Sequence, residues 1–200
     1  MVGLNRLQRA VTPPKSNIAY SEGHKSKGIV DDYKQTKVLY ADEIDSSPVF
    51  VSGGLPFGEI WSEDNTDQTT LNSSGKVQIL SFKNNGHSNN TTPDHTEDHI
   101  TITKAGKYLV TASLAVVNVA AQAHEIDVGL FKNDGTSQFN NVHGHRNLSG
   151  GGGDKGSISI SGIIDTNVND TIELWANTDT AADRIVIFED ITLTLFQIGG

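Results

Sequence analysis

The alternation of apolar and polar positions is clearest near the end of the chain, between Gly156 and Ile198. In residues 157–162 and 171–177 the two kinds of residue alternate with a period of two, which is typical of strands that bury one face. In Arg184–Ile198 apolar residues occupy both parities, so we expect a strand that is covered on both faces. Since an antiparallel sheet needs only one buried face, this pattern predicts contact with another sheet or another subunit.

Earlier segments of strand length show the same period. They predict strands at Gly58–Ser62, Val77–Phe82, His99–Thr103, Tyr108–Val119 and Glu125–Phe131. Lys132–Thr136 is predicted to be a hairpin turn, because a glycine there can adopt positive φ. Two polar stretches, Lys83–Asp98 and Asn140–Asp154, are predicted to be long loops. Roughly eight to ten short strands favour an all-β antiparallel jelly-roll sandwich, with under about a tenth of helix after residue 55.

The first 55 residues differ from the rest, because they are polar and show no steady periodicity. We therefore expect an extended N-terminal arm over residues 1–55 and a jelly-roll domain over residues 56–200. The spacing of apolar residues in Gly3–Ala10 predicts a short helix that ends before Pro13. Scattered large side chains in the arm predict anchoring to a partner rather than a free linker. The predicted anchoring residues are Leu4, Arg6, Leu7, Arg9, Tyr20, Tyr33 and Tyr40.

Charge separates the same two parts of the chain. Residues 1–40 carry seven lysines and arginines against three acidic residues, and their net charge of +4 leaves −13 for the remainder of the total of −9. An acidic domain argues against nucleic-acid binding, and a basic arm predicts an acidic partner. Met1–Ala10 lacks the apolar core of a signal peptide, and no segment has the length of a membrane span. We expect neither a recognisable export signal nor a membrane partner.

Several short motifs resemble, in their order, those of the C1q/TNF-like jelly-roll domain. They are Gly106-Lys107-Tyr108-Leu109-Val110, Leu130-Phe131-Lys132-Asn133-Asp134-Gly135, Asp170-Thr171-Ile172-Glu173-Leu174 and Leu193-Thr194-Leu195-Phe196. Gly58-Glu59-Ile60-Trp61 resembles the start of the variants found in phage and giant-virus structural proteins. The resemblance covers about residues 57–200 and includes no collagen-like stem before the domain. It implies a homotrimer with its last strand near the three-fold axis and interface residues Tyr108, Phe188, Phe196 and Ile198.

Motifs that would carry chemistry are weak in this sequence. Gly150–Ser157 has the residue order Lys-Gly-Ser and is followed by a strand, whereas a phosphate-binding loop has Gly-Lys-Ser before a helix. His143 and His145 offer two imidazoles without a converging third ligand, so we expect no metal. No Gly-x-Ser-x-Gly elbow is present. The aromatic residues Trp61, Trp175 and Tyr108 are interpreted as core or subunit-interface residues, with a sugar platform as the alternative. We expect no enzyme activity and no cofactor.

These observations lead to one functional hypothesis and one alternative. The hypothesis is a virion structural protein, a phage capsid decoration or cement protein made in the host cytoplasm and located on the capsid surface. Its partners would be two further copies of itself and the major capsid protein or another virion protein. The alternative is the receptor-binding head of a phage tail or head fibre. That version predicts an arm that coils with its trimer mates, and residues 13–47 show no heptads.

Overall fold

The structure is a computed structural model that describes residues 54–200, so the predicted arm lies outside the described residues except for Gly54 and Leu55. The described residues form strands and no helix, which confirms the all-β prediction. The strands are β1 (Phe57–Ser62), β2 (Gln68–Leu71), β3 (Val77–Gln78), β4 (Asn84–Asn85), β5 (Thr91–Asp94), β6 (His99–Ile102), β7 (Gly106–Asn118), β8 (His124–Lys132), β9 (Ser137–Leu148), β10 (Lys155–Thr166), β11 (Thr171–Thr178) and β12 (Arg184–Gly199).

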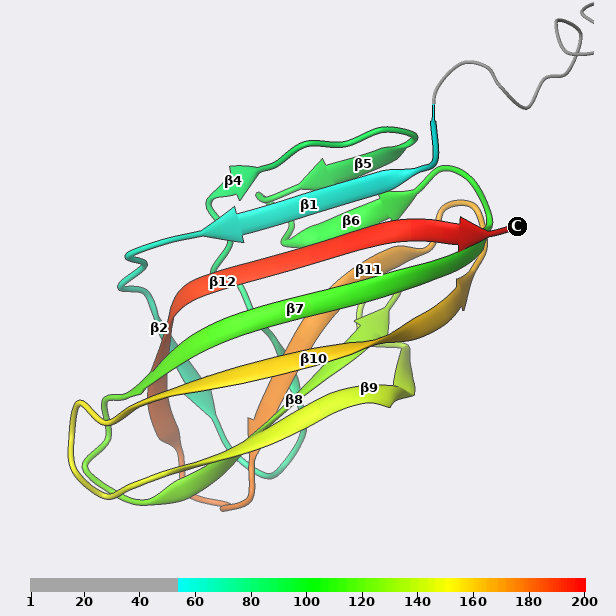
Figure 1. Cartoon of the computed structure of the whole chain (residues 1–200). Coiled ribbons are helices and arrows are strands. Elements are labelled where there is room, and N and C mark those ends of the chain that lie inside the picture. The colour runs from blue at the N-terminus through cyan, green and yellow to red at the C-terminus, as the bar shows by residue number, and fades with distance from the viewer. Residues whose placement is uncertain (1–53) are drawn as a thin grey trace, which may run out of the picture. The chain divides into compact units, whose positions relative to one another are not determined.

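Two antiparallel sheets pack face to face (Figure 1). The front sheet has the strand order β10–β7–β12–β1–β4, and β2 also pairs with β12. The back sheet has the order β5–β6–β11–β8–β9, and β3 also pairs with β11. The start of β1 and the end of β12 lie at the same end of the sandwich, because Phe57 pairs with Phe196. Several strands that pair within a sheet are far apart in the sequence, as in a jelly roll.

The core lies between the sheets and follows directly from the alternation in the sequence. In β7, burial alternates from residue to residue, and the side chains from Tyr108 to Val116 at even positions face the core. The back sheet contributes Ile126, Val128 and Leu130 from β8. Each fully buried aliphatic side chain of this kind contributes roughly 1.5–3 kcal/mol to folding. The period of two therefore predicts these core positions correctly.

Strand β12 explains why apolar residues occupy both parities of its sequence. A β-bulge between Phe188 and Asp190 shifts the register against β7. Val186 and Phe188 face the core before the bulge, whereas Ile191 and the two following alternate positions face it afterwards. An extra residue in a strand reverses which parity points inward. Most of the predicted second apolar face is therefore the same core face, continued in the other parity.

One predicted strand is too long, and two predicted loops are wrong. The predicted strand Val77–Phe82 has strand structure only over β3, although the Ile79 N–H still donates to the Leu174 carbonyl of β11 at 2.9 Å. The predicted loop Lys83–Asp98 contains β4 and β5. The predicted loop Asn140–Asp154 is mostly β9, a polar edge strand. Polar edge strands lack the apolar alternation on which strand prediction depends, because neither face is fully buried.

The predicted hairpin between β8 and β9 is confirmed. Asn133, Asp134 and Gly135 all have positive φ, between 56° and 72°, which matches the backbone reversal that this turn requires. Among the described residues, no helix is long and apolar enough to span a membrane.

Candidate functional site on the outer face of the front sheet

The outward-facing residues of the front sheet form rows that cross β10, β7, β12 and β1. Antiparallel register places Phe57 opposite Phe196, Phe196 opposite Leu109, and Leu109 opposite Ile163. Directly opposed residues in an antiparallel pair point to the same face. These four side chains therefore form one continuous apolar row.

The row extends towards the end of the sandwich where β1 begins. A hydrogen bond of 2.8 Å from the Gln197 N–H to the Pro56 carbonyl continues the pairing beyond β1, so Leu55 and Ile198 lie next to the row. Leu109, Ile163 and Phe196 are 40%, 53% and 43% exposed. We call this surface the apolar patch, and its residues are Leu55, Phe57, Leu109, Ile163, Phe196 and Ile198. A concentration of large exposed apolar side chains is typical of an interaction surface.

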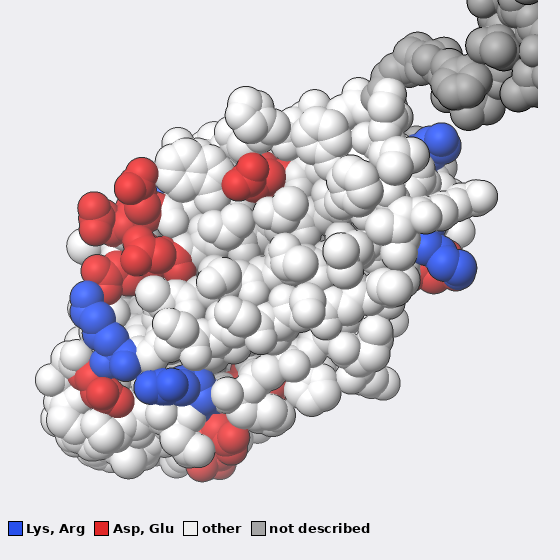
Figure 2. Space-filling view, viewed as in Figure 1, with Lys and Arg blue, Asp and Glu red and all other residues white. Residues whose placement is uncertain are grey.

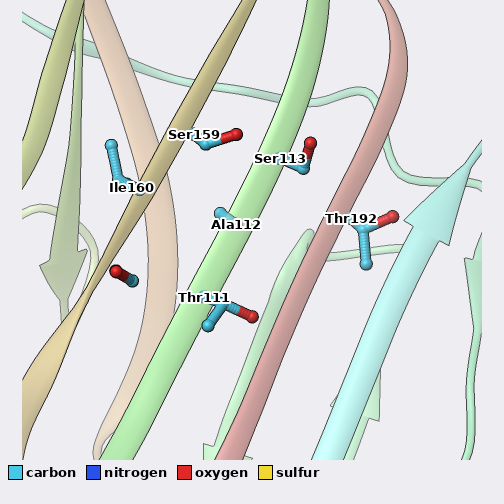
Figure 3. A pocket seen from close by; sticks show the side chains of 7 residues that line it. Thr111, Ala112, Ser113, Ser159, Ile160 and Thr192 are labelled. Carbon is cyan, nitrogen blue, oxygen red and sulfur yellow. The ribbon is translucent and has the colours of Figure 1, made fainter.

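Small hydroxyl side chains cover the middle of the same face. They surround a hollow of about 300 Å³, whose remaining lining is Ala112 and Ile160 (Figure 3). Thr194 lies next to Thr111 in register and continues the hydroxyl surface towards β1. We call this surface the hydroxyl field, and its residues are Thr111, Ser113, Ser159, Ser161, Thr192 and Thr194. The field carries no charge of its own, so it can offer hydrogen bonds without electrostatic attraction.

Most charged residues in this view gather at the end of the face opposite the apolar patch, whereas the Lys107–Asp165 ion pair lies at the patch end (Figure 2). Lys155 Nζ lies 2.7 Å from Glu189 Oε1, and the hydrogen bond from Lys155 to Glu189 raises the pKa of the Lys155 ammonium. Asp190 accepts a hydrogen bond from the backbone N–H of Asp64 at 3.1 Å. The face therefore changes along the strands from apolar through neutral polar to charged.

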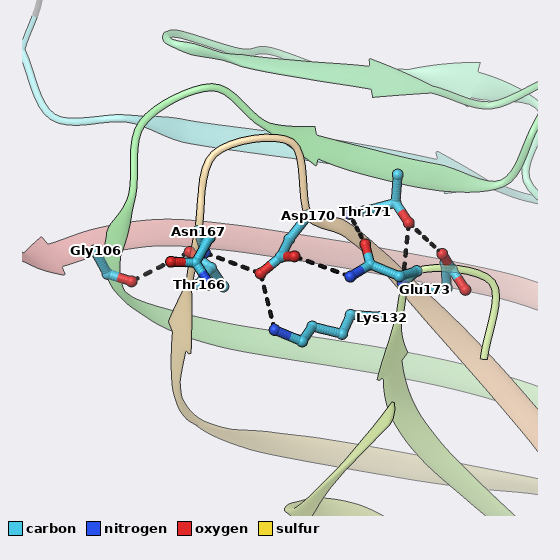
Figure 4. Close-up of polar contacts among 8 residues, drawn as sticks. Gly106, Lys132, Thr166, Asn167, Asp170, Thr171 and Glu173 are labelled. Atoms are coloured by element: carbon cyan, nitrogen blue, oxygen red, sulfur yellow. Dashed lines mark hydrogen bonds and ion pairs between the residues drawn. The ribbon is translucent and has the colours of Figure 1, made fainter. Parts of the chain in front are cut away.

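A second polar cluster lies at one edge of the sandwich and joins two of the family-like motifs (Figure 4). Asp170 accepts hydrogen bonds from Lys132 Nζ at 2.9 Å and from Asn133 Nδ2 at 2.9 Å. The backbone N–H of Asn167 donates to the same carboxylate at 2.9 Å. Burial acts to raise the pKa of Asp170, but these hydrogen bonds outweigh burial and the pKa lies below its usual value.

Glu173 completes this cluster from β11. Its side chain is fully buried, and its two carboxylate oxygens accept the backbone N–H groups of Asp134 and Gly135 at 2.9 and 3.1 Å. The Trp175 indole N–H and the Thr171 hydroxyl donate to the same carboxylate. Four donors leave little capacity for a substrate, so the cluster holds the β8–β9 turn against β11. Its role is structural.

The structure corrects two of the predicted interface residues. Tyr108 and Phe188 are fully buried inside the sandwich, and the Tyr108 hydroxyl donates to the Lys104 carbonyl at 2.7 Å. Side chains without exposed surface cannot contact a second copy, so both belong to the core. Phe196 and Ile198 are exposed, and their predicted role in an interface stays a prediction. The predicted anchoring residues of the arm lie outside the described residues.

The structure brings the two candidate histidines together but places the candidate aromatic residues apart. His143 and His145 lie on β9 with ring centroids 5.4 Å apart, and within residues 54–200 no group of three or more His, Asp or Glu residues could hold a metal ion. Trp175 packs against Phe131 on the back sheet at a centroid distance of 5.6 Å. Of the three aromatic residues considered for a sugar platform, Trp61 belongs to the outer face of the front sheet.

Sequence reasoning missed Leu109 and Ile163 in the apolar patch and all of the hydroxyl field. Both residues occupy the alternate positions of their strands that face away from the core and are otherwise mostly polar. The signal in the sequence is therefore one large apolar residue among polar ones. A row across strands becomes visible only when the register is known, because its members are distant in sequence.

Comparison with known proteins supports the fold. Neither a family model nor a curated protein matches the sequence. Among solved structures, the Eiger TNF of S. frugiperda is similar with a TM-score of 0.50 and 13% sequence identity, over 72% of this chain and 94% of that chain. At this identity the similarity concerns the fold alone. The chain therefore has a C1q/TNF-like jelly-roll fold.

Proposed function

We propose that this chain is a virion structural protein, a phage capsid decoration or cement protein that forms a homotrimer and is anchored to the shell by its N-terminal arm. The apolar patch is the observation that carries the proposal. It lies on the outer face of the front sheet, at the end where the chain enters the domain from residue 54. An assembly of copies through this patch brings together the points at which the chain enters each domain, near residue 54.

The patch supports assembly because of its composition. Phe196 and Ile163 each leave about half of their side-chain surface in contact with water, in the same row as Leu109. Covering such side chains stabilises an assembly by about 25 cal/mol per Å² of apolar surface. The same patch on every copy suits a closed symmetric assembly, and the C1q/TNF-like fold favours three copies.

The charge distribution supports attachment through the arm. The arm is basic, whereas the rest of the chain is strongly acidic. Opposite charges steer a basic segment towards an acidic shell, and buried aromatic and aliphatic anchors such as Leu4, Leu7 and Tyr20 provide most of the affinity. The partner is the major capsid protein or another virion protein, and the location is the capsid surface. The proposal involves no enzyme activity, no cofactor and no nucleic acid.

Assembly is tested with a charge placed in the apolar patch. We expect Phe196→Asp to convert the trimer to a monomer, because three carboxylates would be buried without partners. Leu80→Asp is the matched control, since Leu80 is 61% exposed and lies outside the patch. Sedimentation velocity at micromolar concentration distinguishes the two variants. A stable monomer for the unmodified chain contradicts the proposed assembly.

Attachment is tested with a chain that lacks residues 1–47. We expect the remaining domain to form a trimer that no longer binds assembled capsids, because the jelly roll keeps its own core and loses its anchors. Higher salt should weaken attachment of the full chain only in part, because screening removes the steering by charge and leaves the apolar contacts. Capsid cosedimentation measures occupancy. Full occupancy by the truncated trimer would refute the anchoring role of the arm.

A further inference from the structure

Lys76, Asn177 and Asp127 form a row across the outer face of the back sheet. Lys76 directly precedes β3, and the register of β3 with β11, continued by one residue, places Lys76 opposite Asn177. Asn177 in turn pairs with Asp127 on β8. Opposed residues of antiparallel strands point to the same face, so three neighbouring segments bring an amine, a carboxamide and a carboxylate together. We call these three residues the Lys76 row.

The side chains of the Lys76 row are in direct contact. Lys76 Nζ lies 2.6 Å from Asp127 Oδ2 and donates a hydrogen bond to Asn177 Oδ1 at 2.8 Å. Because a C=O bond measures about 1.23 Å, the Asn177 Cγ atom lies at most about 4 Å from the Lys76 nitrogen. Atoms poised to react are about 3–3.5 Å apart. A small rotation of the lysine side chain therefore brings the amine within reach of the carboxamide carbon.

The row is shielded from water and has an open proton acceptor. The Lys76 side chain is 15% exposed, less than any other lysine that forms an ion pair within residues 54–200. The second carboxylate oxygen of Asp127, Oδ1, is buried and has no hydrogen-bond partner among the same residues. An ammonium group must lose a proton before its nitrogen becomes a nucleophile. Asp127 Oδ1 is available to accept that proton.

A second group of lysine, asparagine and aspartate, at the β8–β9 turn, lacks this arrangement. Lys132 Nζ donates to Asp170 at 2.9 Å (Figure 4), but Asn133 Nδ2 donates to the other oxygen of the same carboxylate. The Asn133 Oδ1 atom accepts the Thr171 N–H at 3.0 Å instead of a lysine. The Lys76 row, by contrast, joins the amine directly to the carboxamide and leaves one carboxylate oxygen open.

We propose that Lys76 and Asn177 form an intramolecular isopeptide bond, and that Asp127 transfers the protons. Asp127 takes a proton from the Lys76 ammonium, and the neutral nitrogen attacks the Asn177 Cγ atom. As the bond from Cγ to Nδ2 breaks, protonated Asp127 gives its proton to the departing nitrogen, which leaves as ammonia. The new amide nitrogen loses its surplus proton to Asp127, which passes it to the ammonia. The reaction consumes no oxidant or reductant.

The bond would act as a covalent lock on the back sheet. It would join positions 101 residues apart in the chain, and it would tie the segment before β3 to β11. A cross-link of this span restricts the unfolded chain, as a disulfide does. The chain contains no cysteine, so disulfides cannot provide such a restraint. The row lies on the back sheet and the apolar patch on the front sheet, so the lock does not depend on the proposed function.

Mass spectrometry of the intact full chain tests the proposal. We expect the purified protein to weigh about 17 Da less than its sequence requires, with or without Met1, because one ammonia molecule is lost. Tandem mass spectrometry of a protease digest should identify a branched peptide that joins Lys76 to Asn177. Lys76→Arg keeps a cation beside Asp127 but removes the attacking amine, so this variant should have its full sequence mass.

Two further variants separate the roles within the row. Asp127→Ala retains the amine and the carboxamide but removes the proton transfer, so we expect no branched peptide. Lys132→Arg is the matched control at the second cluster, and it should keep the mass deficit of the unmodified chain. Circular dichroism establishes that each variant is folded before its mass is compared.

Four results would overturn the proposal. The first is a folded, unmodified chain with its full sequence mass, which would leave the Lys76 row as an ion pair. The second is a deficit of about 18 Da, one water molecule, with a branched peptide that joins Lys76 to Asp127. The third is a deficit that persists in Lys76→Arg, which would assign the lost ammonia to another reaction. The fourth is a branched peptide in Asp127→Ala. Phe196→Asp tests assembly on the other sheet, so the two proposals can fail separately.

Discussion

Asp98 lies in the turn between β5 and β6, where burial of its carboxyl group makes stability sensitive to pH. The residue is 6% exposed, and its side chain accepts a hydrogen bond from the backbone N–H of Phe82 at 2.9 Å. Burial raises the pKa of Asp98 from 3.8 to about 6, although this hydrogen bond and the charges of Lys83 and His95 act in the opposite direction. The protein therefore retains a proton on Asp98 in a range where the unfolded chain has lost it.

The sign of the effect follows from the raised pKa. The protonated carboxyl favours the folded state, so its contribution is fully present below pH 3.8 and is lost as the pH rises to about 6. A difference of about two pKa units corresponds to about 3 kcal/mol. Asp98→Asn removes the charge, keeps an oxygen for the Phe82 N–H, and tolerates the φ of 56° at this position. We expect the variant to be more stable than the unmodified protein by up to about 3 kcal/mol above pH 7, and equally stable near pH 3.5.

Denaturant unfolding of both proteins at one protein concentration, at pH values from 3.5 to 8, measures this difference. Asp94→Asn is the control, because Asp94 is a carboxylate of the same hairpin whose pKa is lowered by hydrogen bonds from Thr96. The ionised Asp94 carboxylate stabilises the folded state above pH 3.8, and this stabilisation is lost as the pH falls. Asp94→Asn should therefore be less stable than the unmodified protein at neutral pH. A stability difference for Asp98→Asn that stays constant from pH 4 to 7 would refute the reasoning.

Two further predictions concern the β8–β9 turn. Glu173→Gln should lower the free energy of unfolding by at least about 2 kcal/mol. The new amide would place its own N–H groups against the N–H groups that now donate to the carboxylate. The control variant Glu63→Gln should change the free energy of unfolding little. Gly135→Ala should cost about 1–3 kcal/mol, because φ is +72° and the new Cβ would lie 2.6 Å from the Trp175 ring, whereas Gly151→Ala has open space and should be nearly neutral. Denaturant unfolding measures all four variants, and equal stability of either pair would contradict the packing described for this turn.

Sequence patterning predicts the central strands well, because each buries one face. β7 and β10 alternate cleanly, β11 does so apart from the buried Glu173, and the inward residues of all three form the core. The prediction fails at β9, where edge position and polar side chains remove the alternation. It is misleading in β12, where the bulge near Glu189 makes one buried face look like two. Phe188 was assigned to an interface for this reason and Tyr108 because of the family resemblance, although the sandwich core already covers both.

The candidate site could be predicted only in part. Phe196 and Ile198 stand out as apolar residues near the end of the chain, and the structure exposes both. The neighbours that turn them into a patch come from β1, β7 and β10, which are far apart in sequence. The hydroxyl field carries an even weaker signal, since alternating serines in a strand normally indicate only a solvated face. Register, which the sequence does not state, places these residues side by side.

The pairing of the first strand with the last has a consequence for the order of events during synthesis. β12 lies between β7 and β1, so the front sheet stays in two pieces until β12 has been synthesised. Translation adds about 5–20 residues per second, and a sheet with such distant partners folds slowly even when complete. The domain must therefore complete its fold after β12 has left the ribosome, and a chain that stops before residue 184 would leave the inner edges of β1 and β7 open to pairing with other nascent chains.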